Sequence, residues 1–224
     1  MKAIFCILFL AVSVTGKGQQ ANADSSQVRK QPTMFGFNVG IGFSDLPGLP
    51  NHSLTHAASM GFGWLITFND HWRLAPELNL STRGTDKTDR LLNAVPLQSS
   101  RTQFSTFNMD VPVVLHYQLG KRVFAGIGVQ FSYLLIGEQS TTGRVVTGEQ
   151  VTVIENIRGL MHKEGFMIPI EIGVSSQGKG GICFTETLRY NLGVMEAFTT
   201  SVVESKYQSL QLYLTMYYRT KRGR

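Results

Sequence analysis

Six ionisable side chains stand inside stretches that are otherwise dominated by apolar residues. A guanidinium, an imidazole and carboxylates that converge in one place can transfer protons, line an ion path, or neutralise one another in a buried network. The six residues are Arg73, Glu77, Asp110, His116, Glu171 and Arg189, with Arg219 as a further candidate. Which of these roles applies depends on the elements that position them.

The segments that carry these charges alternate between large apolar residues and small, polar or charged ones. The stretch FNMDVPVVLHYQLGKRVFAGIGVQFSYLLIG, residues 107–137, shows this most clearly. A period of two residues predicts β-strands with two different faces, and all six charges fall on the polar face. We predict eight strands, at about Met34–Ser44, Ser59–Phe68, Trp72–Gly84, Phe104–Leu119, Val123–Gly137, Gly165–Ser175, Gly181–Asn191 and Ser205–Arg219.

The connections between these strands alternate strictly in length. The short ones are Asn69–His71, Gly120–Arg122 and Ser176–Gly180, and the long ones are Asp45–Ala58, Thr85–Gln103, Glu138–Glu164 and Leu192–Glu204. Outer-membrane barrels combine short periplasmic turns with long extracellular loops in this way. Within the third long connection, Val151–Lys163 is compatible with either a short helix or a hairpin extension.

Alternation alone does not say which face of a barrel points inward. In a soluble, lipocalin-like barrel the large apolar face would line the interior. Here the polar face is rich in Gly and poor in Lys and Glu, which suits a narrow lumen better than a solvent face. Aromatic residues also lie near strand ends, as in the girdles of membrane barrels: Trp72, Tyr117, Tyr133, Tyr190 and Tyr218. We therefore predict an all-β fold, an eight-stranded antiparallel up-and-down transmembrane β-barrel in the cell outer membrane, with the soluble barrel as the alternative.

Residues 1–18 read as a signal peptide, because the apolar run Ile4–Val14 is too short to span a membrane. We expect a flexible lead-in at 19–33, the barrel at 34–219 and a basic tail at 220–224. Cys183 is then the one cysteine of the mature chain, so no internal disulfide is expected. The net charge is +6 but its only cluster is the tail RTKRGR, so nucleic-acid binding is not expected.

The hairpin MDVPVVLHY, GKR, FAGIGVQFSYLL resembles the "EIPLLLKY … GxGxxxSYLL" signature of PorT-like outer-membrane β-barrel proteins of Bacteroidetes. The matching positions are Asp110, Pro112, Gly126, Gly128 and Ser132, while His116 stands where Lys is usual. The resemblance implies an eight-stranded barrel without a cofactor, and one member class is tied to type IX secretion and gliding machinery. The chain departs from the usual aromatic barrel terminus by continuing past Tyr218 into the basic tail.

These patterns favour a non-enzymatic anchor or interaction component over an enzyme. His116 is the one histidine within a predicted strand, and its side chain points inward. The outward faces of the strands therefore offer no Ser–His pair, and we expect no catalytic residues. His52 and His56 are four apart, but the prolines of PGLPNHS argue against a shared helix and hence against a metal site. We expect the six inward charges to pair in a network that fills the lumen; an ion path and acid–base chemistry are the alternatives.

The expected partners are outer-membrane lipid and other envelope or secretion proteins, with no cofactor and no nucleic acid. The alternative function is a small solute or ion pore through the lumen.

Overall fold

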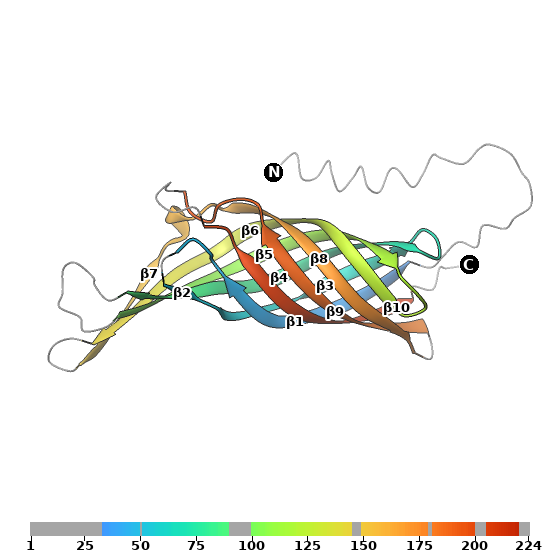
Figure 1. Ribbon diagram of the computed structural model, residues 1–224, viewed down its shortest axis with the longest axis horizontal. Helices are drawn as coiled ribbons and strands as arrows, with labels where there is room; N and C mark the ends of the chain where they lie inside the picture. Colours follow the sequence, from blue (N-terminus) through green and yellow to red (C-terminus); the bar gives the residue numbers. More distant parts are fainter. Residues whose placement is uncertain are drawn as a thin grey trace, which may run out of the picture. The chain divides into compact units, whose positions relative to one another are not determined.

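Eight long strands close into one antiparallel barrel in the computed structural model (Figure 1), which describes residues 33–49, 51–89, 100–144, 149–178, 181–199 and 205–219. The barrel strands are β1 (Met34–Asp45), β3 (Thr55–Thr67), β4 (Trp72–Asp89), β5 (Ser100–Gln118), β6 (Val123–Arg144), β8 (Glu164–Gln177), β9 (Ile182–Gly193) and β10 (Gln208–Arg219). Each pairs with its neighbour in the chain, and β1 pairs with β10 to close the circle. The predicted eight-stranded up-and-down barrel is confirmed.

The register of the strands fixes the tilt of the barrel. The paired residues can be followed once around the barrel, starting at Val123 of β6 and passing through β8, β9, β10, β1, β3, β4 and β5. The path returns to β6 at Tyr133, ten residues further along the chain. With about 4.8 Å between strands and about 3.3 Å per residue, this stagger corresponds to a tilt of about 40°. Barrels of eight strands at such a tilt have an interior that side chains fill.

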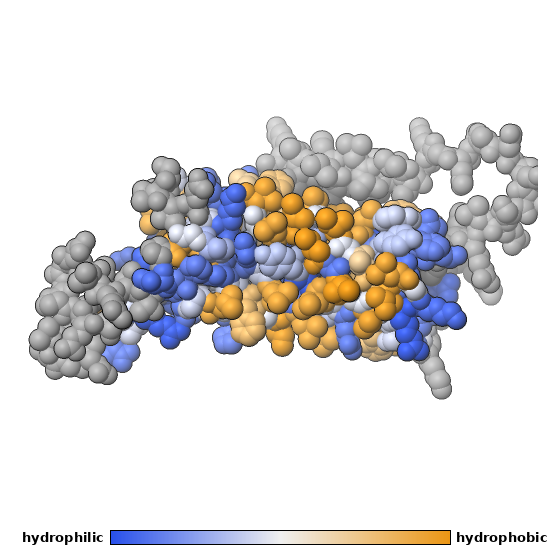
Figure 2. Space-filling view, in the orientation of Figure 1, coloured by the Kyte–Doolittle hydropathy of each residue, from blue (hydrophilic) through white to orange (hydrophobic). Residues whose placement is uncertain are grey.

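The barrel is polar inside and apolar outside. Along β10, Gln211 and Thr215 are buried, whereas Leu210, Leu212 and Leu214 expose 46%, 48% and 51% of their surface. Figure 2 shows the apolar side chains as a band over the middle of the barrel, with hydrophilic residues toward both ends. Such a band is stable only against hydrocarbon, because exposing it to water would forfeit its hydrophobic free energy. The soluble, lipocalin-like alternative is therefore wrong.

Aromatic side chains gather where β4 and β5 meet at the end of the barrel that carries the short turns. The Trp72 and Tyr117 rings lie 4.8 Å apart in a T-shaped contact, and His71 stacks on Tyr117 at 5.9 Å. Amphipathic rings favour the boundary between hydrocarbon and head groups. This short-turn end thus carries part of the predicted girdle.

At the opposite, long-loop end several strands run further than predicted. β4 and β5 remain paired as far as Asp89 and Ser100, and β6 continues to Arg144. The hairpin is completed by β7 (Gln150–Asn156), and η1 (Arg158–Leu160) forms one 3₁₀ turn. The open choice for Val151–Lys163 thus has a mixed outcome: its first six residues belong to a hairpin extension, seen at the left of Figure 1, and Arg158–Leu160 form the 3₁₀ turn. The two-residue β2 (His52–Ser53) pairs with β4 on the other side of this extension.

A β-bulge in β6 changes which residues face the lumen. The register between β5 and β6 shifts at Phe107/Asn108, so that Leu134 and Gly137 are buried while Ile136 is exposed. A bulge places two residues of one strand opposite one of the other and so reverses the alternation. The outward face predicted from simple alternation therefore ends at Leu135, which is half-exposed.

The predicted signal peptide, nearly all of the lead-in and the basic tail lie outside the described residues. Among the residues that the structure describes, no helix is long and apolar enough to cross a membrane.

Candidate functional site

Four of the six predicted lumen charges meet in one cluster near the middle of the barrel. Arg189 of β9, 2% exposed, donates through Nη2 to Oε1 of Glu77 at 2.8 Å and through Nε to Oε1 of Glu171. The His116 Nε2 lies 2.7 Å from Oε2 of Glu171. The pairing of β8 with β9 sets Glu171 directly opposite Arg189, whereas Glu77 reaches the guanidinium from β4 across the lumen.

Each carboxylate oxygen of this cluster has a partner. The second oxygen of Glu77 accepts from Asn79 Nδ2 at 2.8 Å, and the Arg189 guanidinium also lies over the Tyr213 ring at 4.2 Å. Buried charges are tolerated when they are paired and hydrogen-bonded in this way. The Nη1 of Arg189 has no hydrogen-bond partner in the protein, and Arg189 lines a water-sized cavity. The chemistry of this cluster is that of charge neutralisation.

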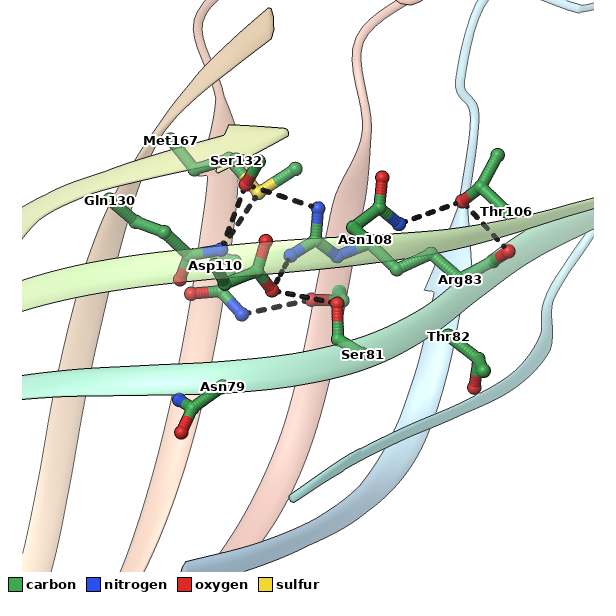
Figure 3. Close-up of polar contacts among 12 residues, drawn as sticks. Asn79, Ser81, Thr82, Arg83, Thr106, Asn108, Asp110, Gln130, Ser132 and Met167 are labelled. Carbon is green, nitrogen blue, oxygen red and sulfur yellow. Dashed lines mark hydrogen bonds and ion pairs between the residues drawn. The ribbon is translucent and has the colours of Figure 1, made fainter. Parts of the chain in front are cut away.

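A second cluster lies closer to the long-loop end and is centred on Arg83 and Asp110 (Figure 3). These two residues form an ion pair, Ser81 donates to Asp110 Oδ2 at 2.7 Å, and Arg83 Nη1 reaches Ser132 Oγ at 3.4 Å. Gln130 also donates to Ser132, at 3.3 Å. A pocket beside this cluster is bounded by Arg83, Met161, Met167 and Tyr207, among others.

The structure thus divides the predicted network in two. Asp110 pairs with Arg83 and not with the Arg189 cluster. Arg73 is half-buried and lines the same cavity as Glu77, but Arg73 takes no part in these ion pairs. Arg219, at the end of β10, is exposed. The sequence analysis did not include Arg83. Arg83 is separated from Arg73 and Glu77 by even numbers of residues along β4, so alternation predicts that it faces the lumen as they do.

The residues of the hairpin motif all line the lumen. Pro112 is fully buried, and Asp110 and Ser132 belong to the Arg83 cluster. At Gly126 a Cβ atom would lie 2.5 Å from Cδ2 of His116, so only glycine leaves that ring in place. At Gly128 a Cβ would collide with the backbone of Val113. The motif thus describes how β5 and β6 pack around His116 and Asp110.

An apolar cluster lies at the long-loop end of the barrel, beside the Arg83 cluster; we call it the loop cap. Its buried members are Leu46, Leu49, Leu134, Ile157, Met161 and Ala197, with Phe104, Phe198 and Tyr207 packed against them. The Phe104 and Phe198 rings meet edge to face at 5.9 Å, and Met161 bridges to Phe198 through the backbone. Burial raises the pKa of Tyr207 to about 12, so this phenol stays neutral at physiological pH. The cap joins three connections, which the sequence alone could not bring together.

The remaining candidates do not form a site. His52 bonds to Asp45 at 3.1 Å and to the Leu49 carbonyl at 2.6 Å, whereas His56 packs on Phe43. In the described part of the chain no group of three or more His, Cys, Asp or Glu side chains is placed to hold a metal ion. Cys183 is buried in a small cluster with Leu65, Ala75 and Tyr217.

Comparison with protein families gives a match over residues 19–199 to the outer membrane protein beta-barrel domain. The chain belongs to this family. The protein is therefore located in the outer membrane, where its apolar outer face contacts lipid. A search of curated proteins finds no match.

Among solved structures the chain is similar to Neisserial surface protein A, at 11% identity over 81% of this chain and 95% of that one, with a TM-score of 0.43. It is also similar to the outer membrane protein OprG from Pseudomonas aeruginosa, at 11% identity over 85% and 99%, with a TM-score of 0.40. Ail of Yersinia pestis aligns at 10% identity over 84% and 100%, with a TM-score of 0.39.

Proposed function

We propose that this chain is a non-enzymatic outer-membrane anchor that presents an interaction surface at its long-loop end. The observation that carries the proposal is the contrast between the two parts of the molecule. The lumen holds the paired charges and the loop cap lies at its long-loop end, whereas the sheet of β4, β5, β6 and β7 continues past this end and finishes in β7, whose seven residues are all exposed. Because the interior of the barrel is filled, the outer loops are the surface through which the protein would act on a partner.

The PorT-like resemblance indicates which kind of partner this anchor would bind. Its motif residues line the lumen together. We infer that the partners are other envelope proteins, with secretion or gliding machinery as the specific candidates. On this proposal the long-loop end faces the exterior, because short turns face the periplasm in such barrels.

A small solute or ion pore is the second candidate. Two observations favour it: Arg189 lines a water-sized cavity, and several lumen polar atoms lack protein partners, including Arg189 Nη1, Asn38 Nδ2 and Gln211 Nε2. Passage would require both the Arg189 cluster and the loop cap to move aside. Ionic conductance across a planar bilayer would detect such a pore.

The interaction function is tested by purifying tagged barrel from outer membranes in mild detergent and identifying what accompanies it. The matched variant replaces residues 140–154 by Asn-Gly, which joins Gln139 to Glu155, already paired across β6 and β7, by a two-residue hairpin turn. We expect envelope proteins to accompany the wild-type barrel in fixed ratio and to be lost from the shortened one, with both barrels folded. Recovery of the wild-type barrel alone would contradict the proposal.

A further inference from the structure

β7 is a bare edge of the sheet that extends past the barrel. Within the described part of the chain it pairs with β6 alone, and all seven of its residues are exposed. The other edge of the extension, at the end of β4, is partly covered by β2 through His52 and Ser53. The extension therefore offers one long open edge.

The hydrogen-bond pattern tells which backbone groups of β7 point to this open edge. The Ile157 N–H donates to the Gly137 carbonyl at 3.0 Å, which makes these two residues a hydrogen-bonded pair. In an antiparallel ladder such pairs alternate along the strand, so Val151, Val153 and Glu155 also pair with β6. The N–H and C=O groups that point away from β6 are those of Gln150, Thr152, Ile154 and Asn156.

β7 carries one charged residue, Glu155, but lacks most of the features that usually protect an edge strand. Its sequence QVTVIEN has no Pro, no Lys and no bulge, and Val151, Val153 and Ile154 expose 46%, 50% and 68% of their surface. Exposed β-branched residues on an unprotected edge favour the addition of another strand. Only an extended polypeptide can supply backbone donors and acceptors in register with this edge.

The charges around β7 indicate which kind of strand fits. Glu155 lies at one end of β7 and Glu149 precedes the other, both exposed, and the strand itself carries no basic residue; Arg158, beyond its end in η1, is half-buried. An added strand with an apolar centre and basic residues at its two ends would match these carboxylates. An acidic strand would face like charge.

We propose that β7 is a docking edge for an extended polypeptide segment whose apolar centre is flanked by Lys or Arg, bound by β-strand addition. This inference rests on the interaction function proposed above and names the edge and the kind of partner.

The test uses the full barrel in nanodiscs and the capped peptide KVTVTVK as probe. Amide hydrogen exchange is followed along β7 by NMR. At saturating peptide the exchange of the Thr152 and Ile154 amides is expected to slow by at least about tenfold, while Val151 and Val153, already bonded to β6, change little. The peptide EVTVTVE is expected to protect them less. No protection by KVTVTVK, or equal protection by both peptides, would overturn the proposal.

A proline variant tests the edge itself. Ile154→Pro removes an N–H that points away from β6 and places a ring on the open edge, so β6–β7 pairing survives while strand addition is blocked. Ile154→Thr keeps the β-branched shape and the N–H. We expect KVTVTVK to protect Thr152 in Ile154→Thr and not in Ile154→Pro. Protection that persists in Ile154→Pro would overturn the proposal.

Purification of the same two variants from outer membranes separates this inference from the function on which it rests. Envelope proteins that accompany wild type, Ile154→Thr and Ile154→Pro equally would overturn the docking edge and leave the interaction function standing. No accompanying protein with wild type would instead contradict the interaction function itself.

Discussion

At the scale of single residues, Arg189 is the side chain on which the middle of the lumen depends. It lies between Glu77 and Glu171 and bonds to both, so one buried cation holds two buried carboxylates. Removing one partner of a buried pair leaves an uncompensated charge, which costs more than the pair itself contributes. Here the loss would leave two such charges.

We therefore expect Arg189→Leu to lower the free energy of unfolding by about 3–5 kcal/mol, measured by urea unfolding of the barrel in lipid vesicles. The matched control is Arg73→Leu, which removes an inward Arg that is half-buried and outside these ion pairs. Equal losses in the two variants would contradict the role of Arg189 as the centre of the cluster.

Gly126 makes a second prediction at this scale. In Gly126→Ala the added methyl group meets the His116 ring and must displace it from Glu171. We expect a loss of about 1–3 kcal/mol in the same unfolding measurement. Gly120→Ala, in a turn where a Cβ meets nothing within 4 Å, should leave the unfolding midpoint nearly unchanged. A neutral Gly126→Ala would show that the ring tolerates displacement.

At the scale of elements, the strands were predictable where the bilayer imposes a pattern and not beyond it. Inside the apolar band one face meets lipid and the other the lumen, so alternation appears in the sequence and the eight strands were found. In β7 all seven residues are exposed, so its two faces do not differ in burial, and at the end of β4 the lumen-facing and outward residues of TDKTD are alike polar, so neither segment carries such a signal. The bulge in β6 was also hidden, since Leu134, Leu135 and Ile136 are all apolar.

The same reasoning explains which parts of the lumen could be predicted. Alternation predicts an inward position for Glu77, Asp110, His116, Glu171 and Arg189, and these residues are buried in the structure. Their division into two clusters depends on the stagger of the strands around the barrel, which no single strand reveals. The loop cap depends on contacts between connections far apart in the chain.

The orientation of the strands makes a prediction for the outer face. Leu212, midway along β10, pairs with Ile41 and Leu188 and faces lipid. Leu212→Arg should cost about 2–4 kcal/mol of unfolding free energy in vesicles, as expected near the middle of a bilayer. Ile154→Arg, on the exposed β7, should cost little. A neutral Leu212→Arg would argue against lipid at this face.

At the scale of the whole molecule, the proposed anchor separates a lumen that holds paired charges from an exposed extension. The Arg189 cluster bridges the lumen, the Arg83 cluster lies nearer the long-loop end, and the loop cap lies at that end. The extension with its open β7 edge lies outside the hydrocarbon band and is free to meet a partner. Anchoring and interaction are thus assigned to different parts of one chain.

The most direct test of this account is the ionic conductance of the purified, folded barrel in a planar bilayer. We predict no single-channel steps from the wild-type protein, because an ion would have to displace both the paired charges and the loop cap. Reproducible steps that change amplitude in Glu77→Gln or Arg189→Leu would place the ion path through the lumen. That result would contradict the filled lumen and favour the pore.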